Sequence, residues 1–207
     1  MISLFIDTST SSVSISIVKD GKILSIIQEG IPNEHSKYAT SYVKKVIDGA
    51  GIDANDVDNI LVVNGPGSFT GVRIGVTIAK TYGYLINKEI IPVSSLKGLA
   101  ISSSNKDNII MSVISANRNN YYIGIYDREY NNLIDEQFVS SDKLLELINE
   151  YNPYIVSNDF YVLGKHKFNK VNLDVVKIVD YYKDMDKVNY HALVPNYLKL
   201  PQAMENR

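Results

Sequence analysis

The sequence contains no cysteine, which excludes disulfides, thiol nucleophiles and cysteine metal sites. It contains only three histidines, His35, His166 and His191, and no two of them have the i, i+4 spacing that places two imidazoles on one helix face. We therefore expect no metal bound to this chain. No GxSxG segment is present either, so the sequence offers no recognisable serine nucleophile.

Long apolar runs are also missing, and none could cross a membrane as a helix. The first residues, MISLFIDTST, carry no basic leader and no cleavage site. Hydrophobic residues make up 45% of the chain, which indicates a globular protein. Together these features predict a cytoplasmic protein that makes no contact with a membrane.

Neither sign of charge dominates the chain. It has 21 Lys and Arg against 23 Asp and Glu, a formal net charge of -2. A protein that holds RNA by itself usually presents a basic face, and no cluster of Lys and Arg of that kind is visible along the sequence. A fold can still assemble such a face from scattered residues.

The first half of the chain alternates between strand-like and helix-like patterns. Val13–Ile17 alternates apolar and polar residues, and Asp20-Gly21 is a typical two-residue hairpin turn. The same patterns predict five strands, at Ser3–Thr8, Val13–Ile17, Lys22–Gln28, Ile60–Asn64 and Glu89–Val93. They also predict two helices, one before the fourth strand and one after it, at Glu34–Ala50 and Phe69–Ile86.

The second half repeats this order of elements without a visible residue-level repeat. We predict three strands at Ile109–Ser115, Tyr121–Asp127 and Leu133–Ser140, then a helix at Ser141–Tyr151 and a strand at Tyr154–Ser157. A further helix is predicted at Leu173–Tyr182. The repeated order predicts an α/β protein with the two-lobed actin/Hsp70-type (ribonuclease-H-like) fold, each lobe a mixed sheet flanked by helices. The expected lobes are residues 1–98 and 99–207.

The segment GPGSFTGVRIG lies between a predicted strand and a predicted helix, where backbone amides and the helix dipole suit a phosphate. Its spacing fits neither the phosphate-loop nor the dinucleotide template. The sequence therefore favours a tight strand-to-helix turn over a nucleotide loop. The motif residues of interest are Gly65, Pro66, Gly67, Ser68, Phe69, Thr70, Gly71, Arg73 and Gly75.

A second candidate is the turn Asp7-Thr8-Ser9 after the first predicted strand. In actin-type ATPases, a turn with acidic and hydroxyl residues at this place handles phosphate and metal. Here the turn has no glycine that would let a phosphate approach closely. We interpret it as a polar hairpin end, at most a vestigial phosphate turn.

The two helices of the first half carry more apolar and tyrosine residues than one sheet face requires. Tyrosine is favoured at protein interfaces because it is large, stiff and amphipathic. We therefore predict a docking surface on the helix pair, formed by Tyr38, Tyr42, Val43, Val46, Val72, Val76, Ile78, Ala79 and Tyr82.

Four segments carry a resemblance to one family, TsaB, also called YeaZ: IDTST near the start, NGPGSFTGVRIG, the following VTIAKTYGY and the late PNYLK. The resemblance covers most of residues 1–100 and is thinner afterwards. The sequence departs from the family at Ser115-Ala116-Asn117-Arg118, where the family usually shows an Asp-Ala-Arg segment.

The resemblance implies a scaffold subunit without an active site, in the complex that forms N6-threonylcarbamoyladenosine at position 37 of ANN-decoding tRNAs. It implies a heterodimer with the catalytic TsaD through the helix pair, recruitment of the ATPase TsaE, and tRNA contact mainly through the complex. ATP or ADP and a metal are expected in the partners, and no cofactor in this chain. Apart from the resemblance, an exposed apolar helix pair tends to self-associate, so a homodimer is an open possibility when the chain is alone. The alternative is an ATP-binding phosphotransferase or ATPase of the actin-like class.

Overall fold

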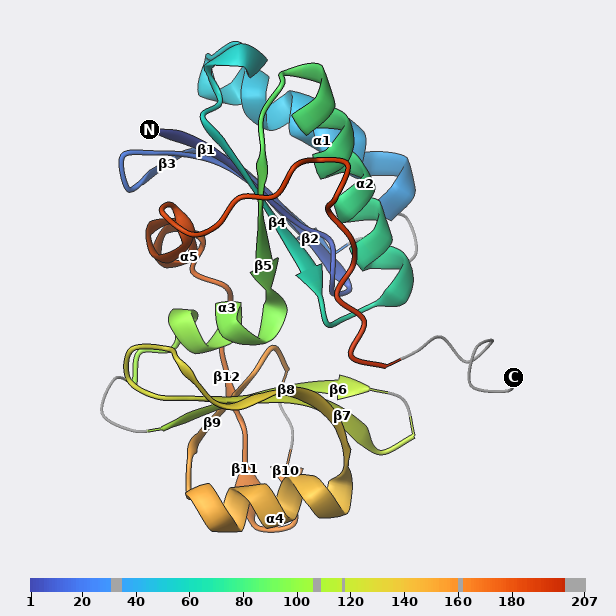
Figure 1. The fold of residues 1–207 in the computed structure, drawn as a ribbon, viewed down its shortest axis with the longest axis vertical. Helices are drawn as coiled ribbons and strands as arrows, with labels where there is room; N and C mark the ends of the chain where they lie inside the picture. The colour runs from blue at the N-terminus through green and yellow to red at the C-terminus, as the bar shows by residue number, and fades with distance from the viewer. Residues whose placement is uncertain (31–34, 106–108, 117, 160–161, 200–207) are drawn as a thin grey trace. The chain divides into compact units, whose positions relative to one another are not determined.

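The computed structural model describes residues 1–30, 35–105, 109–116, 118–159 and 162–199 (Figure 1). Contacts within the chain divide it into two units. Unit 1 consists of Met1–Ser95 and Asp174–Asn196, and unit 2 consists of Leu96–Leu173 with the described residues that follow Asn196. This division differs from the expected lobes, 1–98 and 99–207, because a late part of the chain returns to the first unit.

The described strands of unit 1 form one five-stranded mixed sheet in the order β3-β2-β1-β4-β5. The first three strands pair antiparallel, and β1, β4 and β5 pair parallel. Asp20 and Gly21 both have positive φ, as the predicted hairpin turn requires. The strands are β1 (Ile2–Asp7), β2 (Ser12–Lys19), β3 (Lys22–Gly30), β4 (Asn59–Gly65) and β5 (Ile90–Ser94).

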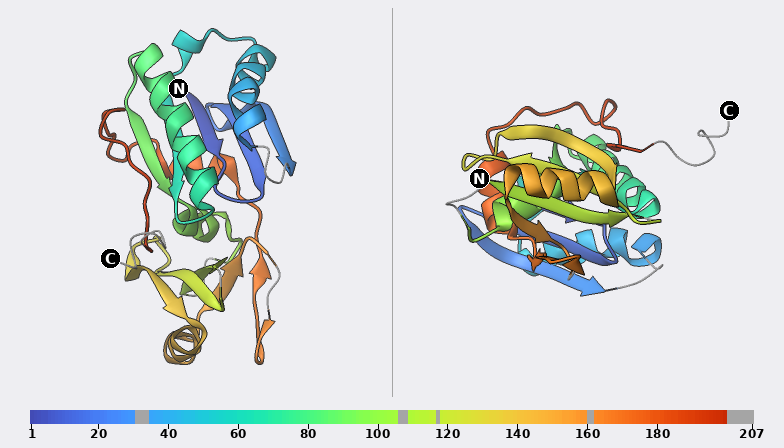
Figure 2. Two further views of the ribbon diagram at one scale, coloured as in Figure 1. Left: turned by 90° about the vertical axis from the view of Figure 1, so that its right-hand side faces the viewer. Right: turned by 90° about the horizontal axis from the view of Figure 1, so that it is seen from below.

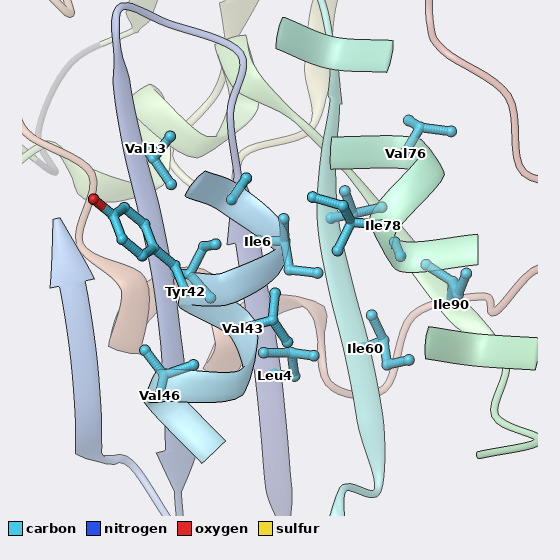
Figure 3. Close-up of a cluster of buried hydrophobic side chains, with 14 of the residues drawn as sticks. Leu4, Ile6, Val13, Tyr42, Val43, Val46, Ile60, Val76, Ile78 and Ile90 are labelled. Atoms are coloured by element: carbon cyan, nitrogen blue, oxygen red, sulfur yellow. The ribbon is translucent and has the colours of Figure 1, made fainter. Parts of the chain in front are cut away.

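Two long helices, α1 (His35–Ala50) and α2 (Phe69–Leu85), cover one face of this sheet side by side (Figure 2). The predicted start of the first helix, Glu34, lies outside the described residues. Leu4 and Ile6 of β1 point toward the helices and join Val43 in one buried cluster (Figure 3). The short helix α5 (Val175–Tyr182) also packs against β1 and β2, and a single 3-10 turn, η1 (Ala54–Asp56), precedes β4.

Five described strands of unit 2 form a sheet with the same order, β8-β7-β6-β9-β12, and the same antiparallel and parallel pairings, while β10 and β11 pair with each other in a separate sheet. Helix α4 (Ser141–Tyr151) packs against β7 and β8 (Figure 1). The other elements are α3 (Ser95–Ser102), β6 (Ile110–Ala116), β7 (Asn120–Tyr126), β8 (Asn132–Ser140), β9 (Tyr154–Ser157), β10 (Val162–Leu163), β11 (His166–Lys167) and β12 (Asn169–Lys170). The duplicated sheet order confirms the predicted two-lobed ribonuclease-H-like fold.

The chain returns to unit 1 through residues 187–196, which we call the return segment. Val188 pairs with Ile90 at the edge of β5, and Leu193 is only 2% exposed in the core beneath α1 and α2. The amide of Asn196 donates to the carbonyl of Asn64 over 2.7 Å. The segment has no helix and follows no periodic pattern, yet its side chains and backbone complete the first unit. Among the described residues, no helix is long and apolar enough to span a membrane.

The return segment should contribute to stability through Leu193. Replacing Leu193 with Ala removes buried methyl groups from the unit 1 core and should lower the free energy of unfolding by about 2–5 kcal/mol. Val194 is 64% exposed, so Val194→Ala is the matched control and should change this free energy by less than about 0.5 kcal/mol. Urea unfolding followed by circular dichroism measures both, and equal effects would mean that the segment is not anchored as described.

Candidate functional site

The glycine-rich motif closes tightly over the turn after β1. A Cβ added at Gly67 would lie 2.5 Å from the Ser9 carbonyl oxygen, and one at Gly71 would lie 2.0 Å from the Thr8 carbonyl oxygen. A Cβ at Gly75 would lie 2.6 Å from Thr8 Oγ1. Each of these separations is too short for a carbon side chain, so the three glycines allow α2 and its preceding loop to rest directly on this turn.

The turn itself is buried, and its polar groups bond to the chain. Asp7, Thr8 and Ser9 are each at most 3% exposed. The Thr8 hydroxyl donates to the Gly71 carbonyl over 2.7 Å, and the Ser68 amide donates to the Ser9 carbonyl over 2.8 Å. The Ser9 amide donates to Asp7 Oδ1, also over 2.8 Å. The Thr8 hydroxyl and the amides of Ser9 and Ser68 therefore already have partners within unit 1, whereas the Ser9 hydroxyl is buried without one.

The first residues of the motif meet the return segment. Gly65 has a φ of +121°, and a Cβ there would lie 2.6 Å from the carbonyl oxygen of Asn196. Asn64 Nδ2 donates to the Val194 carbonyl over 3.2 Å, and Ser95 Oγ donates to the Pro66 carbonyl. The first residues of the NGPG segment therefore contact the first residues of the PNYLK segment, which follows more than a hundred residues later in the sequence.

The outward face of α2 remains open. Phe69, Thr70 and Arg73 are exposed, with the Arg73 guanidinium 5.1 Å from the centre of the Phe69 ring. Ser68 begins the helix, and its hydroxyl accepts from the Gly71 amide over 3.3 Å. These exposed side chains help to form a groove of about 450 Å³ between α1 and α2, lined by Thr40, Phe69, Thr70, Arg73, Ile74, Thr77 and Ile78.

Most of the residues predicted to dock a partner are core residues instead. Seven of the nine are at most 6% exposed, because they form the stripes with which α1 and α2 cover the sheet: Tyr42, Val43, Val46, Val72, Val76, Ile78 and Ala79 (Figure 3). Their side chains cannot form a contact surface in this conformation, with the exception of Ile78 at the floor of the groove. Tyr38 and Tyr82 remain partly exposed, and docking of a partner by the helix pair stays a prediction.

The tyrosines of the helix pair differ in their surroundings. Tyr42 donates its hydroxyl to Glu29 Oε2 over 2.7 Å and stacks on Tyr38, with ring centres 6.0 Å apart. Tyr38 and Tyr82 are half-buried. Burial raises the pKa of the Tyr82 hydroxyl above its ordinary value.

Within the described ranges, no group of three His, Asp or Glu side chains is placed to hold a metal ion. His166 lies in unit 2 and His191 in unit 1, and the side chain of His35 is not described. Asn117, in the segment that differs from the family, also lies outside the described residues.

The groove could not be predicted from an apolar stripe alone, because Thr40, Thr70, Arg73 and Thr77 stand among its apolar lining residues. Phe69, Arg73 and Thr77 follow one another at i, i+4 spacing and so share one helix face. The apolar residues of the same helix mark the opposite, buried face.

The chain is similar to proteins of one family over most of its length. A family model described as TsaD: tRNA N6-adenosine threonylcarbamoyltransferase matches residues 26–182. The tRNA threonylcarbamoyladenosine biosynthesis protein TsaB of Bacillus subtilis is 29% identical over 97% of this chain and 95% of its own length. The TsaB protein of Escherichia coli is 30% identical over 63% of this chain and 57% of its own length.

A solved structure, YeaZ from Pseudomonas aeruginosa, superposes with a TM-score of 0.75 and 20% identity, covering 95% of this chain and 99% of that chain. At this identity the likeness bears on the fold alone. It agrees with the duplicated sheet order described above.

The contact between α2 and the turn after β1 can be tested by adding a single methyl group. A Gly→Ala change inside a helix usually stabilises it by up to about 1 kcal/mol. Gly71→Ala should instead lower the free energy of unfolding by about 1–3 kcal/mol, because the new Cβ collides with the Thr8 backbone.

Gly49 in α1 provides the matched control. A Cβ there meets only the hydroxyl of Ser25, which can rotate away, so Gly49→Ala should keep or raise the free energy of unfolding. Thermal and urea unfolding measure both variants. Stabilisation by Gly71→Ala would contradict the close contact.

Proposed function

Because the chain belongs to the TsaB (YeaZ) family and matches the family model of TsaD, we propose that it is a non-catalytic scaffold and activator subunit. The complex that it serves forms N6-threonylcarbamoyladenosine at position 37 of ANN-decoding tRNAs. The chain takes part in the biosynthesis of this tRNA modification. What we propose is that the chain acts as a scaffold in the complex and has no catalytic activity of its own. We place the complex in the cytoplasm.

The observation that carries this proposal is the closed turn after β1. Thr8 and Ser9 are buried under Gly67 and Gly71, and hydrogen bonds within unit 1 occupy the Thr8 hydroxyl and the Ser9 amide. An actin-like ATPase needs this turn open for its nucleotide. The closed turn therefore argues against the alternative of an ATP-binding phosphotransferase and for a subunit that works by binding its partners.

The groove between α1 and α2 is the proposed docking site for TsaD. It combines an exposed aromatic ring at Phe69, a guanidinium at Arg73 and an aliphatic floor at Ile74 and Ile78. Aromatic and Arg side chains around an apolar floor are typical of the residues that dominate binding energy in protein interfaces. In the isolated chain, the same groove can accept a second copy and give a homodimer.

The remaining partner and cofactor assignments follow from the family. We assign recruitment of TsaE to the assembled complex, and we place ATP or ADP and the metal in the partner subunits. This chain needs no cofactor of its own in the proposed role. Its contact with tRNA comes mainly through the complex.

The groove can be tested by co-purification with a tagged cognate TsaD. Arg73→Glu and Phe69→Ala should each reduce the amount of this chain that co-purifies by at least about tenfold, because they reverse a charge and remove a ring at the groove. Both side chains are exposed, so circular dichroism spectra should stay unchanged.

Lys143→Glu is the matched control, since it makes the same kind of charge reversal at an exposed site on α4. It should leave co-purification with TsaD at the wild-type level. Wild-type co-purification by Arg73→Glu and Phe69→Ala would remove the groove as the docking site.

The closed turn makes a separate prediction about nucleotides. Isothermal titration of the isolated chain with ATP and Mg²⁺ should show no binding in the micromolar range. Micromolar binding that is lost in the Thr8→Ala variant would favour the ATPase alternative, because it would show that the turn opens to accept a phosphate.

A further inference from the structure

The chain passes from one unit to the other at three places, which we call crossings, and each has almost no linker. The crossings are Ser95–Leu96, Leu173–Asp174 and Asn196–Tyr197. At the first crossing, β5 ends at Ser94 and α3 begins at the next residue, so no loop separates them. Units that move independently are usually joined by longer, flexible linkers.

On the side of unit 1, each crossing is fixed by a hydrogen bond. The Ser95 hydroxyl donates to the Pro66 carbonyl, and the Asn196 amide donates to the Asn64 carbonyl over 2.7 Å. The carboxylate of Asp174 accepts a backbone amide and caps α5, which packs against β1 and β2. Two of the three crossings are therefore attached to the NGPG segment that precedes α2.

On the side of unit 2, all three crossings reach the same hydrophobic cluster. Leu96 is fully buried in this cluster, and Leu173 and Leu198 pack against it. The other buried members of the cluster come from α3, β6, β7 and β9. The Lys199 ammonium also lies 4.9 Å from the centre of the Phe138 ring on β8. Three leucines that are far apart in the sequence thus attach the crossings to one place in unit 2.

We propose that Asn196–Leu198 is a strap that limits the movement of unit 2 relative to unit 1. Only Tyr197 stands between Asn196, which is bonded within unit 1, and Leu198, which packs within unit 2, so the strap spans at most about 7 Å. Two crossings leave one rotation free, about the line that joins them, and a third crossing off that line opposes it. The strap is this third crossing.

The glycine at the start of the motif allows the strap to be attached so closely. Gly65 has a φ of +121°, and a Cβ there would lie 2.6 Å from the Asn196 carbonyl oxygen. A residue with a side chain would therefore displace the strap from the NGPG segment. Since α2 begins at Phe69, close behind this segment, the strap joins unit 2 to the start of the helix that carries the groove.

The movement can be measured in the full chain by double electron–electron resonance between spin labels on the two units. The sequence contains no cysteine, so Lys44→Cys on α1 and Glu146→Cys on α4, both exposed, provide the only labelling sites. Insertion of Gly-Ser-Gly-Ser after Tyr197 lengthens the strap by up to about 14 Å and keeps both of its attachments. The width of the distance distribution should then increase at least about twofold.

The matched control is the same insertion between Asp20 and Gly21, in the exposed turn between β2 and β3 of unit 1. It adds the same four residues away from every crossing and should leave the width unchanged. A wild-type width after insertion at Tyr197, or equal widening by the control insertion, would overturn the strap.

A second pair of variants tests the attachment in unit 1. Gly65→Ala places a Cβ against the Asn196 carbonyl and should widen the distribution, whereas Gly71→Ala places one against the Thr8 carbonyl, away from the crossings, and should not. Equal widening by the two variants would show general loosening of unit 1 and would contradict the strap. If Gly65→Ala does not fold, the insertion at Tyr197 decides alone, because it leaves every residue of the chain in place.

The strap goes beyond the proposed function and can fail separately from it. Co-purification with TsaD decides the proposed function, whereas the distance distribution is measured on the chain without any partner.

Discussion

The direct contact between the turn after β1 and the glycine face of α2 is the constraint on which unit 1 depends. Because Gly67, Gly71 and Gly75 carry no side chain, the helix rests on the backbone of Thr8 and Ser9. This contact fixes the inward face of the helix, so Val72, Val76 and Ala79 enter the core. The same contact covers the place where an actin-like enzyme would hold phosphate, and it turns Phe69 and Arg73 outward. The closed turn and the exposed helix face are thus two results of one packing arrangement.

The return segment is the second support of this arrangement. It caps the motif at Gly65, places Leu193 in the core and ties its backbone to Lys80. One stretch of chain therefore completes the fold and also presents Tyr190 and His191 beside Tyr84. The two ends of α2 therefore differ: a groove with an apolar floor lies at the amino end, and the ring of Tyr84 lies beside those of Tyr190 and His191 at the carboxyl end.

Most regular elements could be predicted from the sequence, and the exceptions have physical reasons. Except for the short helix α3 and the turn η1, for which the sequence gives no bounds, the strands and helices from β1 to β9 are predicted within a few residues, because their apolar residues repeat with the period of a strand or helix. Strands β10, β11 and β12 contain two residues each, too few to show any period. The return segment is held by backbone contacts and by Leu193, which leave no pattern in the sequence. The docking residues were misplaced because an apolar stripe marks the buried face of a helix, while the exposed face of α2 carries threonines and Arg73.

The central claim is that this chain is required for the tRNA modification without performing its chemistry. The most direct measurement is the formation of N6-threonylcarbamoyladenosine in an ANN-decoding tRNA by purified cognate TsaD and TsaE, supplied with ATP and threonylcarbamoyl-adenylate, with and without this chain. We predict that the modification rate falls to near background when the chain is omitted, and that the chain alone modifies no tRNA. Full activity of TsaD and TsaE without it, or modification by the chain alone, would contradict the account.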